Sequence, residues 1–166
     1  TPIVISLLPT AAIDYADPFC TSVTTAQGVT LTGTGAFSGG TYSSTAGLTI
    51  NTANGSIIPS SSTAGTYTVT YAVPSNVGCP SFNVTTSVVI NPVPVFTVSG
   101  TSPTVCNGTD GSLLISGLDP STDYNVTYND DGTPVGPGVM TSNGSGEIII
   151  SGLNAGSYDN FVISYV

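Results

Sequence analysis

The sequence contains no lysine, no arginine and no histidine, against nine aspartate and glutamate residues, so its formal net charge is −9. Without cationic side chains, neither the phosphates of a nucleic acid nor an anionic membrane surface finds a partner. Without histidine, the usual general base at neutral pH and the imidazole ligands of zinc and copper are missing. Without lysine, Schiff-base chemistry is excluded. We therefore expect no nucleic-acid partner and no enzymatic activity.

Long apolar runs are also lacking. A membrane-spanning helix needs about 20 apolar residues, whereas the run at residues 3–8 is short and lies between Pro2 and Pro9. It has no basic segment before it, as a signal peptide would. It predicts a first strand or the end of a preceding domain, without membrane insertion, and any export signal is expected outside this chain.

The residues that are present predict strands and turns. Residues 39–71 set the pattern: Leu48 and Ile50 alternate with polar residues, Asn54-Gly55 is a tight-turn dipeptide, and Tyr67 and Tyr71 belong to a second alternating run. Valine, isoleucine, threonine and tyrosine favour strands. No window has helical spacing, so the fold class is predicted to be all-β.

The turns are spaced as in β-sandwiches. In the first part of the chain they separate predicted strands at residues 13–15, 19–20, 29–32, 41–43, 48–51, 56–58, 66–73 and 81–90. Pro92 and Pro94 favour an extended backbone that cannot join the middle of a sheet. We therefore predict one sandwich at residues 1–91, a linker at 92–94 and a second, shorter sandwich at 95–166.

Three tyrosines are candidate core residues. Tyr67, Tyr124 and Tyr158 each follow a turn and open a strand. At this place the ring packs into the end of the core while the hydroxyl bonds the backbone of the turn, as at the tyrosine corner of sandwich folds.

Two of the three cysteines are predicted to form a disulfide. Cys20 is near the first strands of the first domain and Cys79 precedes its last strand, and such regions can face each other across a sandwich. The acidic, threonine-rich composition suggests an extracellular chain, in which disulfides persist. Closing so long a loop would contribute about 4 kcal/mol in the chain-entropy model. The alternative is two free, buried thiols.

The carboxylates form no recognisable catalytic pair, and no catalytic or cofactor-binding residue is predicted. Calcium is an alternative at Asn129-Asp130-Asp131-Gly132, and Asp110, or Asp14 with Asp17, are further candidate ligands. These sequences lack the spacing of an EF-hand, and turns capped by Asp and Asn side chains explain them better. We therefore assign no metal site.

Several motifs recur along the first domain: Phe19-Cys20, Leu31-Thr-Gly-Thr-Gly, Gly40-Thr-Tyr-Ser-Ser-Thr-Ala-Gly-Leu48, Ala64-Gly-Thr-Tyr-Thr-Val-Thr-Tyr71 and Gly78-Cys79. Through them this domain resembles the immunoglobulin-like repeat of giant surface adhesins of Bacteroidota, of the gliding-motility SprB kind, and the resemblance covers nearly the whole chain. The second is similar to the shorter SprB-type repeat through Cys106-Asn-Gly, Asp110-Gly-Ser and Gly152-Leu-Asn-Ala-Gly-Ser-Tyr158, but lacks its usual tryptophan.

The resemblance implies two tandem immunoglobulin-like β-sandwiches in an extracellular protein of the bacterial cell surface, exported by the type IX system and serving gliding or attachment. It also implies that the partner of Cys106 lies beyond Val166 in a longer polypeptide. An intermolecular disulfide and a free thiol are the alternatives for Cys106.

Three functions follow as hypotheses. The first is a structural and adhesive segment whose partners are neighbouring repeats and whose array binds surfaces or glycans. The second is a self-assembling filament subunit that donates an edge strand or the run at residues 3–8 to a neighbour. The third, a carbohydrate-binding module, is disfavoured because the chain has no tryptophan for an aromatic platform.

Overall fold

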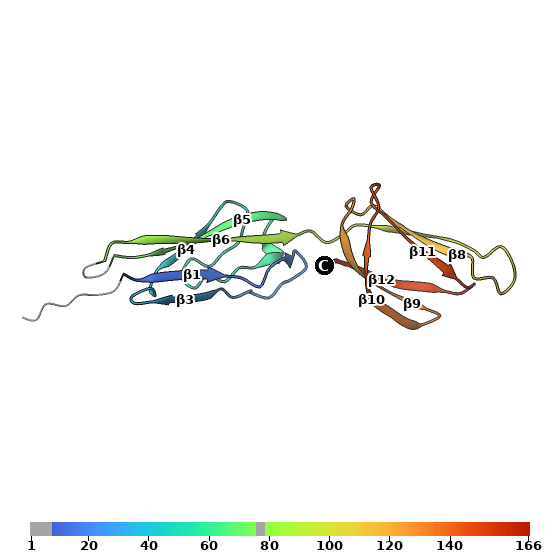
Figure 1. Cartoon of the computed structure of the whole chain (residues 1–166), viewed down its shortest axis with the longest axis horizontal. Helices are drawn as coiled ribbons and strands as arrows, with labels where there is room; N and C mark the ends of the chain where they lie inside the picture. The colour runs from blue at the N-terminus through green and yellow to red at the C-terminus, as the bar shows by residue number, and fades with distance from the viewer. Residues whose placement is uncertain (1–7, 76–78) are drawn as a thin grey trace, which may run out of the picture. The chain divides into compact units, whose positions relative to one another are not determined.

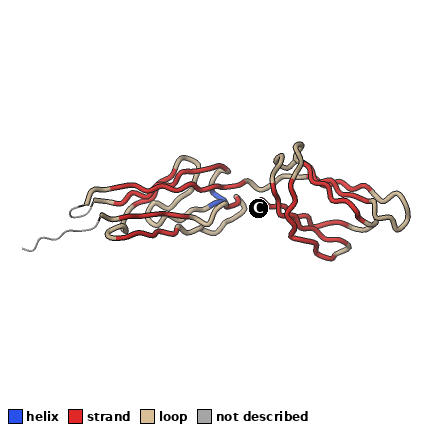
Figure 2. The backbone as a smooth tube through the Cα atoms, viewed as in Figure 1, coloured by secondary structure: helices blue, strands red, loops and turns tan. Residues whose placement is uncertain are grey.

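The computed structural model describes residues 8–75 and 79–166, and it is all-β (Figures 1 and 2). The chain divides into two compact units, Thr1–Pro92 and Val93–Val166. In each unit the sheets pack as in a β-sandwich, so the predicted fold class is confirmed. Within the described ranges, no helix is long and apolar enough to cross a membrane.

The first unit has a two-stranded and a four-stranded sheet. Its strands are β1 (Thr10–Asp14), β2 (Phe19–Cys20), β3 (Thr30–Thr34), β4 (Thr41–Ser44), β5 (Gly65–Val73) and β6 (Phe82–Asn91). The orders are β1-β3 and β2-β6-β5-β4, and among these described strands only the pairing of β2 with β6 is parallel.

Strand β5 follows the predicted alternation. Tyr67, Val69 and Tyr71 are buried, whereas Thr66 and Thr68 are exposed and Thr70 is half-buried. Successive side chains of a strand point to opposite faces of its sheet. The apolar face of β5 therefore lies in the core, and the threonine face is exposed or half-buried.

Two of the predicted strands are not formed. Residues 48–51 and 56–58 contribute only isolated bridges, in which Ile57 pairs with Ile50 and with Gln27. The Asn51 side chain accepts hydrogen bonds from the N–H groups of Ala53 and Asn54, and the Gly55 N–H bonds the Asn51 carbonyl. This turn uses backbone groups that a longer ladder would need. The predicted strand at residues 3–8 lies outside the described residues except for Leu8.

The second unit contains two three-stranded sheets. Its strands are β7 (Thr97–Thr101), β8 (Gly111–Ser116), β9 (Asp123–Asp130), β10 (Thr133–Thr141), β11 (Glu147–Leu153) and β12 (Tyr158–Tyr165). The orders are β11-β8-β7 and β10-β9-β12, with every pairing antiparallel.

The two similar segments of the second unit are neighbours in one sheet. Residues 111–118 supply β8 and residues 146–153 supply β11, and the strands pair antiparallel with Ile115 opposite Ile148. Both isoleucines are buried. The repeated sequence therefore makes two adjacent strands that share one apolar face.

Each unit has its own core. The buried residues of the first are Ile13, Tyr15, Tyr42, Leu48, Ile57, Tyr67, Val69, Tyr71, Val73, Val88 and Ile90. Those of the second are Leu113, Ile115, Leu118, Tyr124, Val126, Tyr128, Ile148, Ile150 and Ile163. No residue belongs to both clusters, and Pro92 and Val93, where the division falls, belong to neither.

Candidate functional site

The three candidate tyrosines tie their strands to the preceding turns. The Tyr67 hydroxyl donates to the carbonyl of Thr63 at 2.6 Å, and the Tyr158 hydroxyl donates to that of Asn154 at 3.0 Å. The Tyr124 hydroxyl accepts the N–H of Asp119 at 3.0 Å. Tyr67 and Tyr124 are buried, whereas Tyr158 is half-buried against its core. These contacts are structural.

The structure does not form the predicted disulfide between Cys20 and Cys79: both thiols are free and half-buried. Cys20 pairs with Asn91 at the end of β6, whereas Cys79 precedes Phe82 at its start. A strand of ten residues separates these ends by about 30 Å, and a disulfide needs Cα atoms within about 7 Å. The prediction assumed that the regions around the two cysteines face each other across the sandwich, because the sequence did not reveal that β2 runs parallel to β6.

The immediate surroundings of the Cys20 and Cys106 thiols differ. The Cys20 thiol donates to the carbonyl of Pro92 at 3.6 Å. Cys106 is exposed, lies in the connection between β7 and β8 and has no disulfide partner among the described residues.

Most carboxylates bond groups of their own fold. Asp131 and Ser157 are joined by two hydrogen bonds. The Ser157 N–H donates to the Asp131 carboxylate at 2.7 Å, and the Asp131 N–H donates to the Ser157 carbonyl at 2.8 Å. This links the β9–β10 turn to the β11–β12 connection. Carboxylates that accept comparable bonds are Asp17, Asp110, Asp119, Asp123 and Glu147.

These bonds also shift two pKa values. The hydroxyl and N–H of Thr104 stabilise the ionised form of Asp110 and lower its pKa. Burial, followed by the hydrogen bond to Asp119 at 2.6 Å, raises the pKa of Tyr165. The Asp110 shift thus follows from a contact within the β7–β8 connection, whereas that of Tyr165 follows first from burial.

The candidate calcium ligands do not converge. Among residues 8–75 and 79–166, no three carboxylate or thiol side chains are grouped as a metal site would require. Asp131 faces Ser157, Asp110 bonds Thr104, and Asp17 accepts the N–H of Val89 at 2.9 Å. The bonds of Asp131 and Asp17 reach residues 26 and 72 positions away in the chain, so these two carboxylates link distant segments and do not cap their own turns as predicted.

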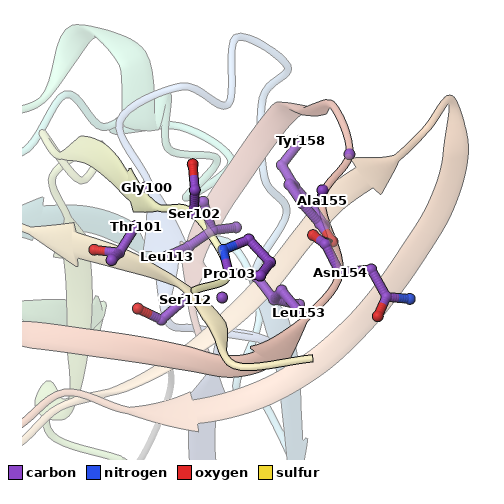
Figure 3. Close-up of a pocket in the computed structure, with 12 residues that line it drawn as sticks. Gly100, Thr101, Ser102, Pro103, Ser112, Leu113, Leu153, Asn154, Ala155 and Tyr158 are labelled. Atoms are coloured by element: carbon purple, nitrogen blue, oxygen red, sulfur yellow. Dashed lines mark hydrogen bonds between the residues drawn. The ribbon is translucent and has the colours of Figure 1, made fainter. Parts of the chain in front are cut away.

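The second unit has a cleft of about 260 Å³ that the sequence did not predict (Figure 3). Its residues come from the end of β7, the start of β8 and the connection from β11 to β12. They are Gly100, Thr101, Ser102, Pro103, Gly111, Ser112, Leu113, Leu153, Asn154, Ala155, Gly156 and Tyr158. Pro103 lies beside Leu113 and Leu153, with the ring of Tyr158 across from them.

Glycine makes room for this cleft. A Cβ added at Gly100 would meet only the Leu113 Cδ2 at 3.4 Å and the Ser112 carbonyl at 3.9 Å, which are ordinary contacts. No lining residue is charged. The cleft therefore fits uncharged, largely apolar groups. Only the glycines in the β7 and β8 segments signalled it in the sequence, and glycine alone has too many other uses to predict a cleft.

No protein-family model matches this sequence, and no curated protein matches it.

Proposed function

We propose that this chain is a structural and adhesive segment of a large extracellular protein of the bacterial cell surface. Its two β-sandwich units act as consecutive spacers in a repeat array, and the array serves attachment or gliding. Neighbouring repeats are its direct partners, and surfaces or glycans are the ligands of the array. The resemblance to SprB-type adhesins supplies the cell-surface part of this proposal.

The separation of the two cores carries the proposal. The hydrophobic clusters of the two units share no residue, and the chain passes from one unit to the other at Pro92 and Val93. A unit with its own core keeps its fold when neighbours are added, which is what an array of spacers requires.

The aromatic residues favour a spacer over a carbohydrate-binding module. All eight tyrosines and all five phenylalanines lie in the described residues, and every one is buried or half-buried. Binding of a polysaccharide chain on a flat surface relies on exposed aromatic rings. These rings instead pack in the cores.

The carboxylates favour a spacer over a hydrolase. A glycosidase holds one carboxyl with a raised pKa opposite a second across a cleft. At Asp110 the hydrogen bonds from Thr104 lower the pKa of the carboxyl, which is the opposite of what a general acid needs. No carboxylate lines the cleft of the second unit.

A domain-replacement experiment in the native organism tests this function. Antibody against the chain should label intact cells, and deleting the 166-residue segment from the parent should reduce attachment. Replacing it with two unrelated sandwich domains of equal length is the control. Recovery of attachment with the replacement domains identifies the segment as a spacer. Attachment that stays reduced identifies a segment that binds the surface itself. Absence of antibody label on intact cells overturns the proposal.

A further inference from the structure

We propose that the cleft of the second unit receives the apolar run at residues 3–8 of a second copy of this chain. The run adds as a strand to the free edge of β7 and places alternate side chains over Gly100, toward Pro103 and Leu113. The copies thereby join head to tail. This docking does not depend on the proposed function, because an adhesin segment and a filament subunit could both use it.

The acceptor combines an edge with a pocket. Strand β7 is the last strand in the order β11-β8-β7, so among the described residues it has a strand partner on one side only. Its final residues, Gly100 and Thr101, line the cleft. Strand addition uses these two elements, because the edge supplies backbone hydrogen bonds and the pocket selects alternate side chains.

The edge of β7 is poorly protected against pairing. Natural edges are commonly protected by lysine, by proline within the strand or by a bulge. Strand β7 reads Thr97-Val-Ser-Gly-Thr101, with none of these residues and with no register shift against β8. By contrast, the edge strand β10 contains Pro134 and Pro137 and has a register shift.

The donor matches the acceptor in length and charge. The run Ile3-Val-Ile-Ser-Leu-Leu8 has no charged residue and would extend over about 20 Å as a strand, compared with about 17 Å for the five residues of β7. Two copies with a net charge of −9 repel each other. An uncharged run entering an uncharged cleft adds no further repulsion.

The donor also has a reason to be buried. Leu8, its last residue, has a side chain that is 71% exposed. Isoleucine, valine and leucine side chains gain free energy when they leave water, so the whole run favours burial. Because donor and acceptor belong to different units, the contact is heterologous, and such contacts form open chains unless the rotation between copies closes a ring.

The test measures self-association of the complete chain by sedimentation velocity over a range of protein concentrations. We expect oligomers that grow with concentration and that a peptide of residues 1–10 dissociates. Ile5→Asp in the donor should weaken association about tenfold or more, since it brings a charge into the cleft. Gly100→Val in the acceptor should also weaken association, because its side chain would fill part of the cleft.

Gly144→Val is the matched control. A Cβ at Gly144 meets nothing within 4 Å, and this glycine lies in the β10–β11 turn away from the cleft. It should associate like the natural chain, and circular dichroism should show that all three variants are folded. A monomer at every concentration overturns the proposal. So does association that Ile5→Asp and Gly100→Val leave unchanged.

Discussion

The hydroxyl of Tyr15 donates a hydrogen bond of 2.6 Å to the carbonyl of Gly55, 40 residues later in the chain. Tyr15 is buried, and Gly55 has a φ of +74°, in the left-handed region. The bond joins the segment after β1 to the Asn54-Gly55 turn. A turn predicted from local sequence is thus held in place by a residue that the local sequence does not indicate.

Replacing Gly55 should destabilise the first unit. In Gly55→Ala the added Cβ would lie 2.7 Å from Val29 Cγ1 and 2.8 Å from Tyr42 Cε1, and the positive φ would be strained. We expect a loss of about 1–3 kcal/mol in the free energy of unfolding, measured by urea denaturation. Gly28→Ala is the control, because its Cβ meets nothing within 4 Å. Equal stability of the two variants would contradict the described turn.

Tyr15 should make the first unit sensitive to alkali. Burial, with a smaller contribution from repulsion by Tyr42, raises the pKa of Tyr15 to about 12, compared with about 10 in an unfolded chain. The folded state disfavours the ionised form, so this stabilisation is complete below about pH 10 and is lost as the pH rises toward 12. The free energy of unfolding, measured by denaturation at several pH values, should therefore fall less steeply between pH 10 and 12 for Tyr15→Phe than for the natural chain. An unchanged slope would show that Tyr15 ionises equally easily in both states.

The hydroxyl of Tyr67 should contribute measurably to stability. Tyr67→Phe removes its bond to the Thr63 carbonyl, and we expect a loss of about 0.5–1.5 kcal/mol in the free energy of unfolding. Tyr42→Phe is the control: Tyr42 is buried to the same 6% exposure, but its hydroxyl makes no hydrogen bond within the described residues. A larger loss in the Tyr42 variant than in the Tyr67 variant would contradict this assignment.

All three thiols should react without prior reduction. Cys20, Cys79 and Cys106 are free, so alkylation in denaturant without a reducing agent should add three labels, as measured by the intact mass. Adding a reductant first should change nothing. A single label that becomes three after reduction would instead support the predicted pairing of Cys20 with Cys79.

Local patterns in the sequence were enough to predict the fold class. The alternation of Tyr67, Val69 and Tyr71 with threonine depends only on which face of a strand is buried. The hydrogen bonds of Tyr67 and Tyr158 join residues four apart, so they too follow from a short stretch of sequence.

Long-range features were harder to predict. The parallel pairing of Cys20 with Asn91 and the bond from Tyr15 to Gly55 depend on how distant segments meet. The cleft depends on small residues from separate strands converging at one end of a sheet. The alternation of apolar and polar residues carries no information about contacts between distant segments. This explains why the disulfide prediction was wrong and the cleft was not predicted.

The most direct test of the proposed function is the intact, denatured mass of the polypeptide isolated from its native source, before and after reduction. The proposal predicts a covalent chain far heavier than the 16.5 kDa of these 166 residues, since a repeat array is one polypeptide. A reduced chain near 16.5 kDa would contradict the adhesin-array proposal and indicate a filament assembled from short subunits.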